Sequence, residues 1–357
     1  MFLFLSIKTY GQIDNKECSD FDMKWLYNTT TSQVFWNLNS SKKNKNLKAL
    51  LLKKDEIKRI NINSSGLKKI PEVLFEFKNL EELDISNNRF ENIESLVDDL
   101  SKFKKLKVLN ITFCGIKSLP DNLYRLNNIE AISFKGNELV DIENIGLLDN
   151  LKFLILRKNK TLVKLPNSIS KLRCLKILDI SDTNIVELSD ELSNCKELIS
   201  IVANYSKIRK ITNKIGDLIS LRNLNLGANE IRELPFTIGQ LKKLEDLKLG
   251  SNDIERLPSS ISNLKRLDAL GLEYNRFKDF PNSIMNLENL RLLKLHNNSI
   301  LEIPTELGKL PKLSLLYVDH EIISQENIAL LNNMNSKLKV KRHDAMRRAP
   351  ELPKRKN

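Results

Sequence analysis

The chain has 357 residues, of which 41% are hydrophobic and 29% are charged. This balance is typical of a folded protein and excludes an intrinsically disordered chain. The 58 basic residues outnumber the 45 acidic ones, giving a formal net charge of +13, which favours anionic partners only in a non-specific way.

The first twelve residues (1–12), MFLFLSIKTYGQ, contain an apolar run from Phe2 to Ile7 and the small residue Gly11. Such a run followed by a small residue is typical of the second half of a secretory signal peptide, here truncated because it lacks a basic n-region. Its Tyr-Gly-Gln ending resembles those of exported bacterial proteins. This interpretation predicts a secreted or cell-envelope protein. The alternative is a cytoplasmic protein in which these residues form an apolar strand or tail. This segment would then pack on the first of the sequence repeats, which begins at Ile57.

Residues 13–56 precede the repeats and carry both tryptophans, Trp25 and Trp36. We expect this region to form an N-terminal cap of helical or irregular structure. A cap is needed because the open edge of the first repeat would otherwise pair with other strands.

From residue 57 the sequence repeats the pattern L-x-x-L-x-L-x-x-N-x-L, with most steps being 23 residues. The spacing predicts about twelve repeats over residues 57–335, the last part of which forms a C-terminal cap. The repeats start at Ile57, Leu80, Leu106, Ile129, Leu151, Leu175, Leu198, Leu221, Leu244, Leu267, Leu290 and Leu313.

Each recurring element of the pattern has a physical role, as residues 244–264 illustrate. Leu247 and Leu249 alternate with polar residues and predict a short strand. Asn252 can satisfy backbone groups where the chain leaves that strand. Pro258 prevents the strand from continuing, and the following I-x-x-L predicts a helical or 3₁₀ return on the other side.

A stack of such repeats buries one continuous core. The sequence therefore predicts an α/β solenoid, a horseshoe with a parallel concave sheet and a helical or 3₁₀ convex side. The full pattern, L-x-x-L-x-L-x-x-N-x-I-x-x-L-P-x-x-I-x-x-L, resembles the leucine-rich repeats of the scribble and Ras-suppressor-like class, including plant Ras-group and bacterial members. The resemblance covers about residues 57–333 and implies the fold, but it is poorly specific for function.

Beyond Val318 the pattern decays, and residues 322–334 are predicted to form a closing helix. Residues 336–357 are basic and contain two prolines, so we expect a disordered tail. No aromatic residue is interleaved with the basic ones, as stacking on nucleic acid would require. The sequence accordingly predicts no specific nucleic-acid binding, and no stretch is long enough for a transmembrane segment.

Residues with the spacing of a catalytic, cofactor or metal site are missing from the sequence. It contains no phosphate-binding glycine loop, no H-E-x-x-H and no G-x-S-x-G. The four cysteines fit neither a zinc site nor a disulfide framework, and Cys195, which replaces a repeat leucine, is interpreted as a small buried hydrophobe. We therefore expect a protein that is not an enzyme and has no cofactor or metal.

The concave face offers candidate binding residues, because the third, fifth, seventh and eighth positions of each repeat point away from the core. Two groups of large residues at these positions are predicted to be exposed patches, and we favour the first as the ligand site. The first comprises Phe153, Ile155, Arg157, Ile177, Asp179, Val202 and Tyr205, and the second comprises Tyr274, Leu292, His296, Leu315 and Tyr317.

These patches predict a monomeric scaffold that binds a protein or peptide ligand on its concave face. The alternative is an exported cell-envelope protein that recognises surface polysaccharide or a host molecule, since Tyr205 and Tyr274 could stack on sugars. An apolar patch flanked by charges favours protein, whereas evenly spaced aromatic residues with paired carboxylates would favour sugar.

Overall fold

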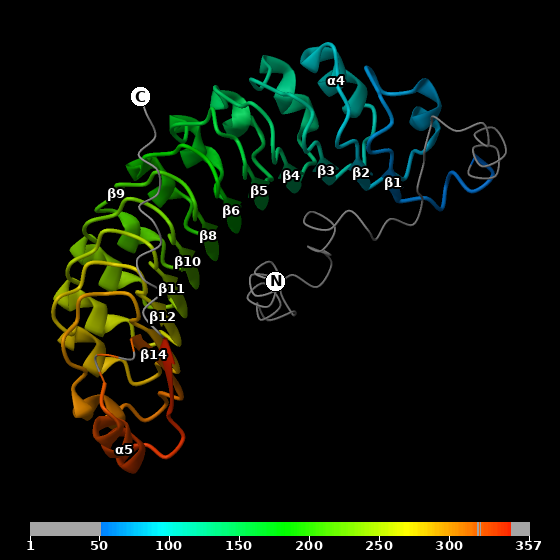
Figure 1. Ribbon diagram of the computed structural model, residues 1–357. Coiled ribbons are helices and arrows are strands. Elements are labelled where there is room, and N and C mark those ends of the chain that lie inside the picture. The colour runs from blue at the N-terminus through cyan, green and yellow to red at the C-terminus, as the bar shows by residue number, and fades with distance from the viewer. Residues whose placement is uncertain (1–50, 320, 322, 344–357) are drawn as a thin grey trace.

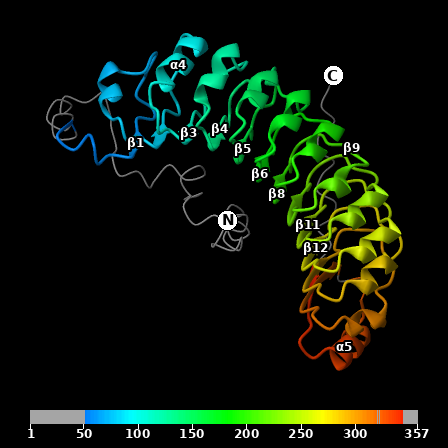
Figure 2. The same ribbon diagram turned by 180° about the vertical axis from the view of Figure 1, so that it is seen from behind.

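The computed structural model describes residues 51–319, 321 and 323–343. The chain winds into an arc whose strands line the inner side and whose short helices line the outer side (Figure 1). The opposite view shows the same arrangement (Figure 2). The predicted horseshoe, with a parallel concave sheet and a largely 3₁₀ convex side, is confirmed.

Thirteen strands of the described residues form one sheet, and every pairing in it is parallel. In spatial order they are β1 (Arg59–Asn61), β2 (Glu82–Asp84), β3 (Val108–Asn110), β4 (Ala131–Ser133), β5 (Phe153–Ile155), β6 (Ile177–Asp179), β8 (Ser200–Val202), β10 (Asn223–Asn225), β11 (Asp246–Lys248), β12 (Ala269–Gly271), β13 (Leu292–Lys294), β14 (Leu315–Asp319) and β15 (Lys339–His343). A separate two-stranded sheet joins β7 (Glu187–Leu188) to β9 (Lys210–Ile211).

The core lies between this sheet and the convex segments. The central residue of each strand of the main sheet from β1 to β13 is a leucine or isoleucine, and it pairs in register with its equivalent on the next strand, as in Leu224, Leu247 and Leu270. Leu247 and Leu249 are both fully buried, as the pattern predicts. Each repeat therefore contributes one layer to a core that runs through the described repeats.

The convex side consists mainly of 3₁₀ helices. They are η1 (Glu72–Glu76), η2 (Asp121–Leu126), η3 (Glu143–Leu147), η4 (Asn167–Lys171), η5 (Asp190–Asn194), η6 (Ile215–Asp217), η7 (Phe236–Gln240), η8 (Ser259–Asn263), η9 (Asn282–Asn286) and η10 (Thr305–Lys309). The repeat prolines precede seven of them with φ between −63° and −78°, the range that the proline ring imposes. The 26-residue repeat instead forms an α-helix, α4 (Ile93–Leu100), whose N-cap Asn92 accepts a bond from Ser95.

The asparagines at the ninth position of the repeat bond backbone groups as predicted, and we refer to them as the asparagine ladder. Asn252 Nδ2 donates to the carbonyls of Leu226 and Leu249, each at 2.9 Å, and its Oδ1 accepts from the Ile231 amide at 3.0 Å. Where another residue replaces the asparagine at this position, the side chain makes fewer hydrogen bonds to backbone carbonyls. The Thr183 hydroxyl donates to a single carbonyl at 2.8 Å. The ladder thus satisfies backbone groups that the turns bury.

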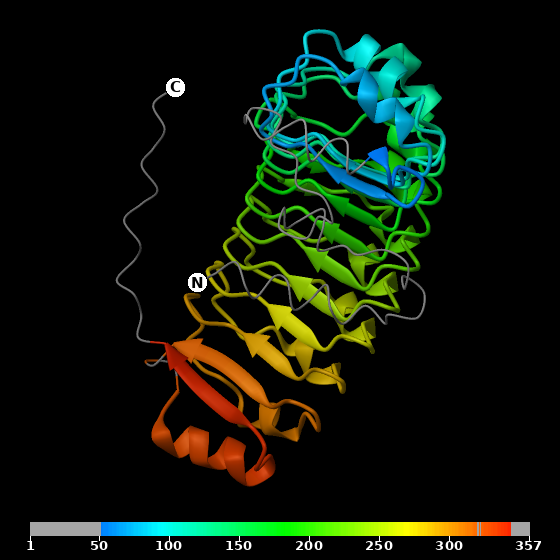
Figure 3. The same ribbon diagram turned by 90° about the vertical axis from the view of Figure 1, so that its right-hand side faces the viewer.

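The C-terminal end departs from the prediction. The closing helix is α5 (Gln325–Met334), three residues shorter than expected, with Ser324 as its N-cap. The prediction that residues 336–357 form a disordered tail is wrong for Lys339–His343, which form β15 beside β14 (Figure 3). This added strand covers the edge that β14 would otherwise expose. Residues 344–357, the predicted signal segment 1–12 and most of the predicted cap 13–56 lie outside the described residues.

Candidate ligand-binding site on the concave face

The eighth residue of the repeat has left-handed backbone geometry. Ten non-glycine residues have φ between 51° and 63°, namely Ser64, Asn87, Phe113, Lys158, Asp182, Tyr205, Ala228, Ser251, Tyr274 and Asn297. Large side chains are uncommon in this conformation. Phe113, Tyr205 and Tyr274 nevertheless occupy it and are exposed by 46%, 64% and 42%, so three aromatic rings reach solvent where strands end.

The first predicted patch is not the exposed surface that the sequence suggested. Phe153, Ile155, Ile177 and Asp179 are only 4%, 1%, 2% and 1% exposed. Phe153 pairs in register with Ile177, and Ile155 with Asp179. Because the sheet curves inward, such neighbours crowd one another on the concave side, and Asp179 is further held by Ser181. The prediction that these four residues are exposed is therefore wrong.

These buried apolar residues do not belong to the main core. Phe153, Ile155 and Ile177 are buried, but the continuous core cluster contains their neighbours Leu154 and Leu156 instead. This alternation matches a strand with one face toward the core and the other toward the concave side. Of the other predicted members, Arg157 and Val202 are partly exposed and Tyr205 is the most exposed.

The second predicted group lies together on β12 to β14. The ring centroids of Tyr274 and His296 are 5.5 Å apart in an edge-to-face arrangement, and those of His296 and Tyr317 are 6.1 Å apart. Leu292 pairs in register with Leu315 on the neighbouring strand. Both leucines and Tyr317 are partly exposed, while His296 is 7% exposed. We refer to Tyr274, Leu292, His296, Leu315 and Tyr317 as the aromatic patch.

Charged residues border the aromatic patch. Lys294 Nζ lies 5.8 Å from the centre of the Tyr317 ring and 3.7 Å from Glu273 Oε1. Glu273 Oε2 is buried and has no hydrogen-bond partner among the described residues. Gly250 and Gly271 leave room for this carboxylate, because a Cβ on either would come within 2.7 and 2.9 Å of it. The site thus combines exposed rings, a cation and an acceptor oxygen.

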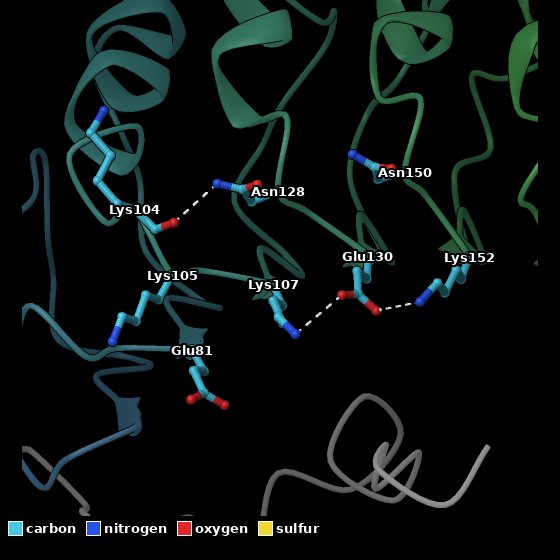
Figure 4. A pocket seen from close by; sticks show the side chains of 8 residues that line it. All are labelled: Glu81, Lys104, Lys105, Lys107, Asn128, Glu130, Asn150 and Lys152. Atoms are coloured by element: carbon cyan, nitrogen blue, oxygen red, sulfur yellow. Dashed lines mark hydrogen bonds and ion pairs between the residues drawn. The ribbon is translucent and has the colours of Figure 1, made fainter. Parts of the chain in front are cut away.

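A separate hollow of about 530 Å³ lies where strands β2 to β5 begin (Figure 4). Its lining residues are Glu81, Lys104, Lys105, Lys107, Asn128, Glu130, Asn150 and Lys152. Lys107 and Lys152 both pair with Glu130, at 3.4 and 2.7 Å. Burial works to raise the pKa of Glu130, but these two lysines outweigh it and hold the pKa below its usual value. Protein groups therefore already neutralise much of the charge in the hollow.

Groups of ligands suited to a metal ion are missing from the part of the chain that the structure describes. Within the same residues, no helix has the length and apolarity to cross a membrane. Cys195 is buried, as expected of a small hydrophobe; Cys114 is also buried, and Cys174 is exposed.

Two family models match the chain. Residues 206–328 match a leucine-rich repeat region, and residues 78–124 match a model of two leucine-rich repeat copies. With the parallel sheet and its repeated turns, these matches make the chain a leucine-rich-repeat solenoid. No curated protein sequence matches it significantly.

Solved structures share the fold. A leucine-rich-repeat protein of Leptospira interrogans is 28% identical, with a TM-score of 0.68 over 84% of this chain and 81% of its own. An internalin from Listeria monocytogenes is 21% identical, with a TM-score of 0.60 over 83% of this chain and 93% of its own. In the Toll–Spatzle complex of Drosophila, a chain is 21% identical, with a TM-score of 0.63 over 73% of this chain and 37% of its own.

Proposed function

We propose that the chain is a non-enzymatic scaffold that binds a protein or peptide ligand on its concave face. The observation that carries this proposal is the aromatic patch on β12 to β14, where Tyr274, His296 and Tyr317 follow one another across adjacent strands. Tyrosine rings bordered by charge are typical anchors of protein interfaces.

The surroundings of the patch support a protein ligand. Leu292 and Leu315 add a partly exposed apolar surface beside the rings, and contiguous apolar surface commonly marks an interaction site. The side chain of Glu273 is 22% exposed and supplies a carboxylate that can accept from a backbone amide or a basic side chain of the ligand.

A pull-down from native extract tests this function. The intact protein is compared with the double variant Tyr274→Ala, Tyr317→Ala and with Tyr124→Ala, whose exposed tyrosine lies on convex helix η2. We expect a protein retained by the intact chain and by Tyr124→Ala to be lost from the double variant, whose circular dichroism should remain unchanged. Equal recovery by all three would contradict a ligand site at the aromatic patch.

Recognition of polysaccharide is the second candidate, favoured by the 64% exposure of Tyr205. An exposed ring presents a flat apolar face on which a sugar can stack. A glycan array distinguishes the two candidates: binding to an array that is lost in Tyr205→Ala but kept in Tyr124→Ala supports a sugar ligand. Retention of all array binding by Tyr205→Ala argues against it.

We further propose that the chain is of the scribble and Ras-suppressor-like repeat class and is exported to the cell envelope or beyond. The class rests on the 23-residue repeat with its proline, as in residues 244–264. Export rests on the apolar run from Phe2 to Ile7, followed by Gly11. N-terminal sequencing of the protein from fractionated cells tests this, since export by a cleaved signal requires the first residues to be missing.

A further inference from the structure

Three cations converge where strands β4 and β5 end on the concave side. Lys135 and Arg157 occupy the seventh position of consecutive repeats, and the Gly136 amide donates to the Arg157 carbonyl at 2.8 Å. Lys158 follows Arg157 and is exposed. Lys135 and Arg157 are partly buried, so all three cations are within reach of a ligand. We refer to Lys135, Arg157 and Lys158 as the cationic spot.

The protein balances these charges only in part. Among the described residues, no ion pair joins any of the three to a carboxylate. The nearby Asp179 is buried, and its Oδ1 accepts from the amide and hydroxyl of Ser181 at 2.9 and 2.5 Å. Burial lowers the pKa of Lys135, the charges of Arg157 and Lys158 lower it further, and only the charge of Asp179 opposes them. An excess of positive charge therefore remains.

One donor of the spot is unsatisfied. Arg157 Nε is buried and has no hydrogen-bond partner in the part of the chain that the structure describes. A buried polar group without a partner destabilises the folded protein, and more so if it is charged. This nitrogen is enclosed by the protein, so a ligand acceptor would bond the other guanidinium nitrogens of the partly exposed Arg157.

An aromatic surface adjoins the spot. The Phe113 amide donates to the Lys135 carbonyl at 2.9 Å, and the Phe113 ring lies over Gly136 with 46% of the residue exposed. A ligand bound here would thus meet an apolar ring beside the cations.

The spot is narrow. The equivalent positions of the flanking strands carry Thr112 on one side and Ser181 on the other, so the cations span two strands, roughly 5 Å apart. A long polyanion gains affinity by neutralising many phosphates in a row. Cations on only two strands are better suited to one or two carboxylates than to a long polyanion.

We propose that the cationic spot, with Phe113, receives an acidic segment of the protein ligand, with a carboxylate bonded to Arg157 and an apolar side chain against the Phe113 ring. This rests on the proposed function and names the chemistry of the partner. Arginine pairs with carboxylates through short, charge-assisted bonds, and the guanidinium of the partly exposed Arg157 provides such donors.

Fluorescence anisotropy with a synthetic peptide tests the proposal. The probe is a labelled peptide in which two glutamates flank a phenylalanine, and its counterpart carries glutamines instead. We expect the glutamate peptide to bind the intact full chain at least about tenfold more tightly, as expected for one charge-assisted bond. Arg157→Gln should remove this preference, and Lys135→Gln should reduce it. The control is Lys164→Gln, an exposed lysine of the same repeat, which should bind as the intact chain does.

Several outcomes would overturn the proposal. These are equal binding of the two peptides by the intact chain, full binding by Arg157→Gln, and tighter binding of a single-stranded RNA than of the glutamate peptide through the same residues. Failure of the two proposals is distinguishable in the pull-down. If Arg157→Gln retains the captured protein and the Tyr274→Ala, Tyr317→Ala variant loses it, the scaffold function stands and the acidic segment is refuted. If the glutamate peptide binds through Arg157 but neither variant alters capture, the cationic spot binds acidic peptides and the proposed function of the aromatic patch is refuted.

Discussion

The ring of Phe113 lies directly over Gly136, so closely that a Cβ on Gly136 would be 2.0 Å from the ring atom Cε1. Both residues occupy the eighth position of consecutive repeats, and both have left-handed backbones, with φ of 54° and 67°. A glycine tolerates this geometry without strain, whereas a phenylalanine does not. The absence of a side chain at Gly136 thus allows a strained, exposed phenylalanine to lie flat on the next repeat.

We expect Gly136→Ala to lower the free energy of unfolding by about 1–3 kcal/mol, because the new Cβ meets the ring and the backbone remains left-handed. Urea denaturation measures the loss. In a Phe113→Ala background only the backbone strain remains, so the same substitution should then cost less. Equal costs in the two backgrounds would show that the ring does not depend on Gly136.

The asparagine ladder makes the second prediction. Asn252→Ala removes the hydrogen bonds of this side chain to the backbone and should lower the free energy of unfolding by about 3 kcal/mol, because buried groups lose their partners. Asn252→Thr should cost less, since the Thr183 hydroxyl shows that one bond can be kept at this position. The control is Asn263→Ala at the exposed end of η8. Denaturation midpoints that fall equally in Asn252→Ala and Asn263→Ala would contradict the role of the ladder.

The cysteines should differ in reactivity. Burial raises the pKa of the Cys114 thiol to about 11 and that of Cys195 to about 12, so neither forms appreciable thiolate near neutral pH. Cys174 is exposed. We expect iodoacetamide at about pH 8 to alkylate Cys174 in the folded protein and to reach Cys114 and Cys195 only after denaturation. Mass spectrometry of peptides measures each site, and labelling of native Cys195 as fast as Cys174 would refute the prediction.

The fold was predictable because the repeat places buried residues at fixed spacings. Leu244, Leu247 and Leu249 are all fully buried, and the seven repeat prolines stand before the 3₁₀ helices where the pattern places them. Strand β15 was not predictable, because Lys339–His343 has the composition of a basic tail and joins the sheet through its backbone. Such pairing depends on the free edge of β14 and leaves little trace in residue types.

The site was predicted only in part. Position within the repeat indicates which face a side chain occupies, but not how crowded that face is. Phe153 and Tyr317 both point to the concave side, yet the first is buried and the second is partly exposed. Glu273 and Lys135 were not predicted as binding residues, because large apolar side chains, and not charged ones, mark a binding patch in the repeat pattern. For Glu273 a signal existed in the sequence, since Gly250 and Gly271 in neighbouring repeats leave space for its carboxylate.

Asp179 makes the last prediction, which concerns pH. Burial raises the pKa of this carboxyl above its ordinary value of 3.8, while the bonds from Ser181 and the charges of Arg157 and Lys135 oppose the rise. Between pH 3.8 and the raised pKa, the folded protein therefore holds a proton that the unfolded chain has already lost. The free energy of unfolding consequently falls as the pH rises through this range. Asp179→Asn keeps an acceptor for Ser181 without the charge. It should melt at a higher temperature than the wild type at neutral pH, with the difference shrinking as the pH falls toward 3.8.

Asp190 should show the opposite sign and serves as the control. Its pKa is lowered by the hydrogen bond from the Thr212 hydroxyl and by Lys214, so it contributes stability above its unfolded-state pKa that is lost as pH falls through the folded value. Asp190→Asn should therefore melt at or slightly below the wild-type temperature at neutral pH and match it in acid. If Asp179→Asn instead melts lower than the wild type at neutral pH, the attraction of Asp179 to Arg157 and Lys135 outweighs the cost of its burial. The cationic spot would then already hold its own carboxylate, and the reason for expecting an acidic ligand there would be lost.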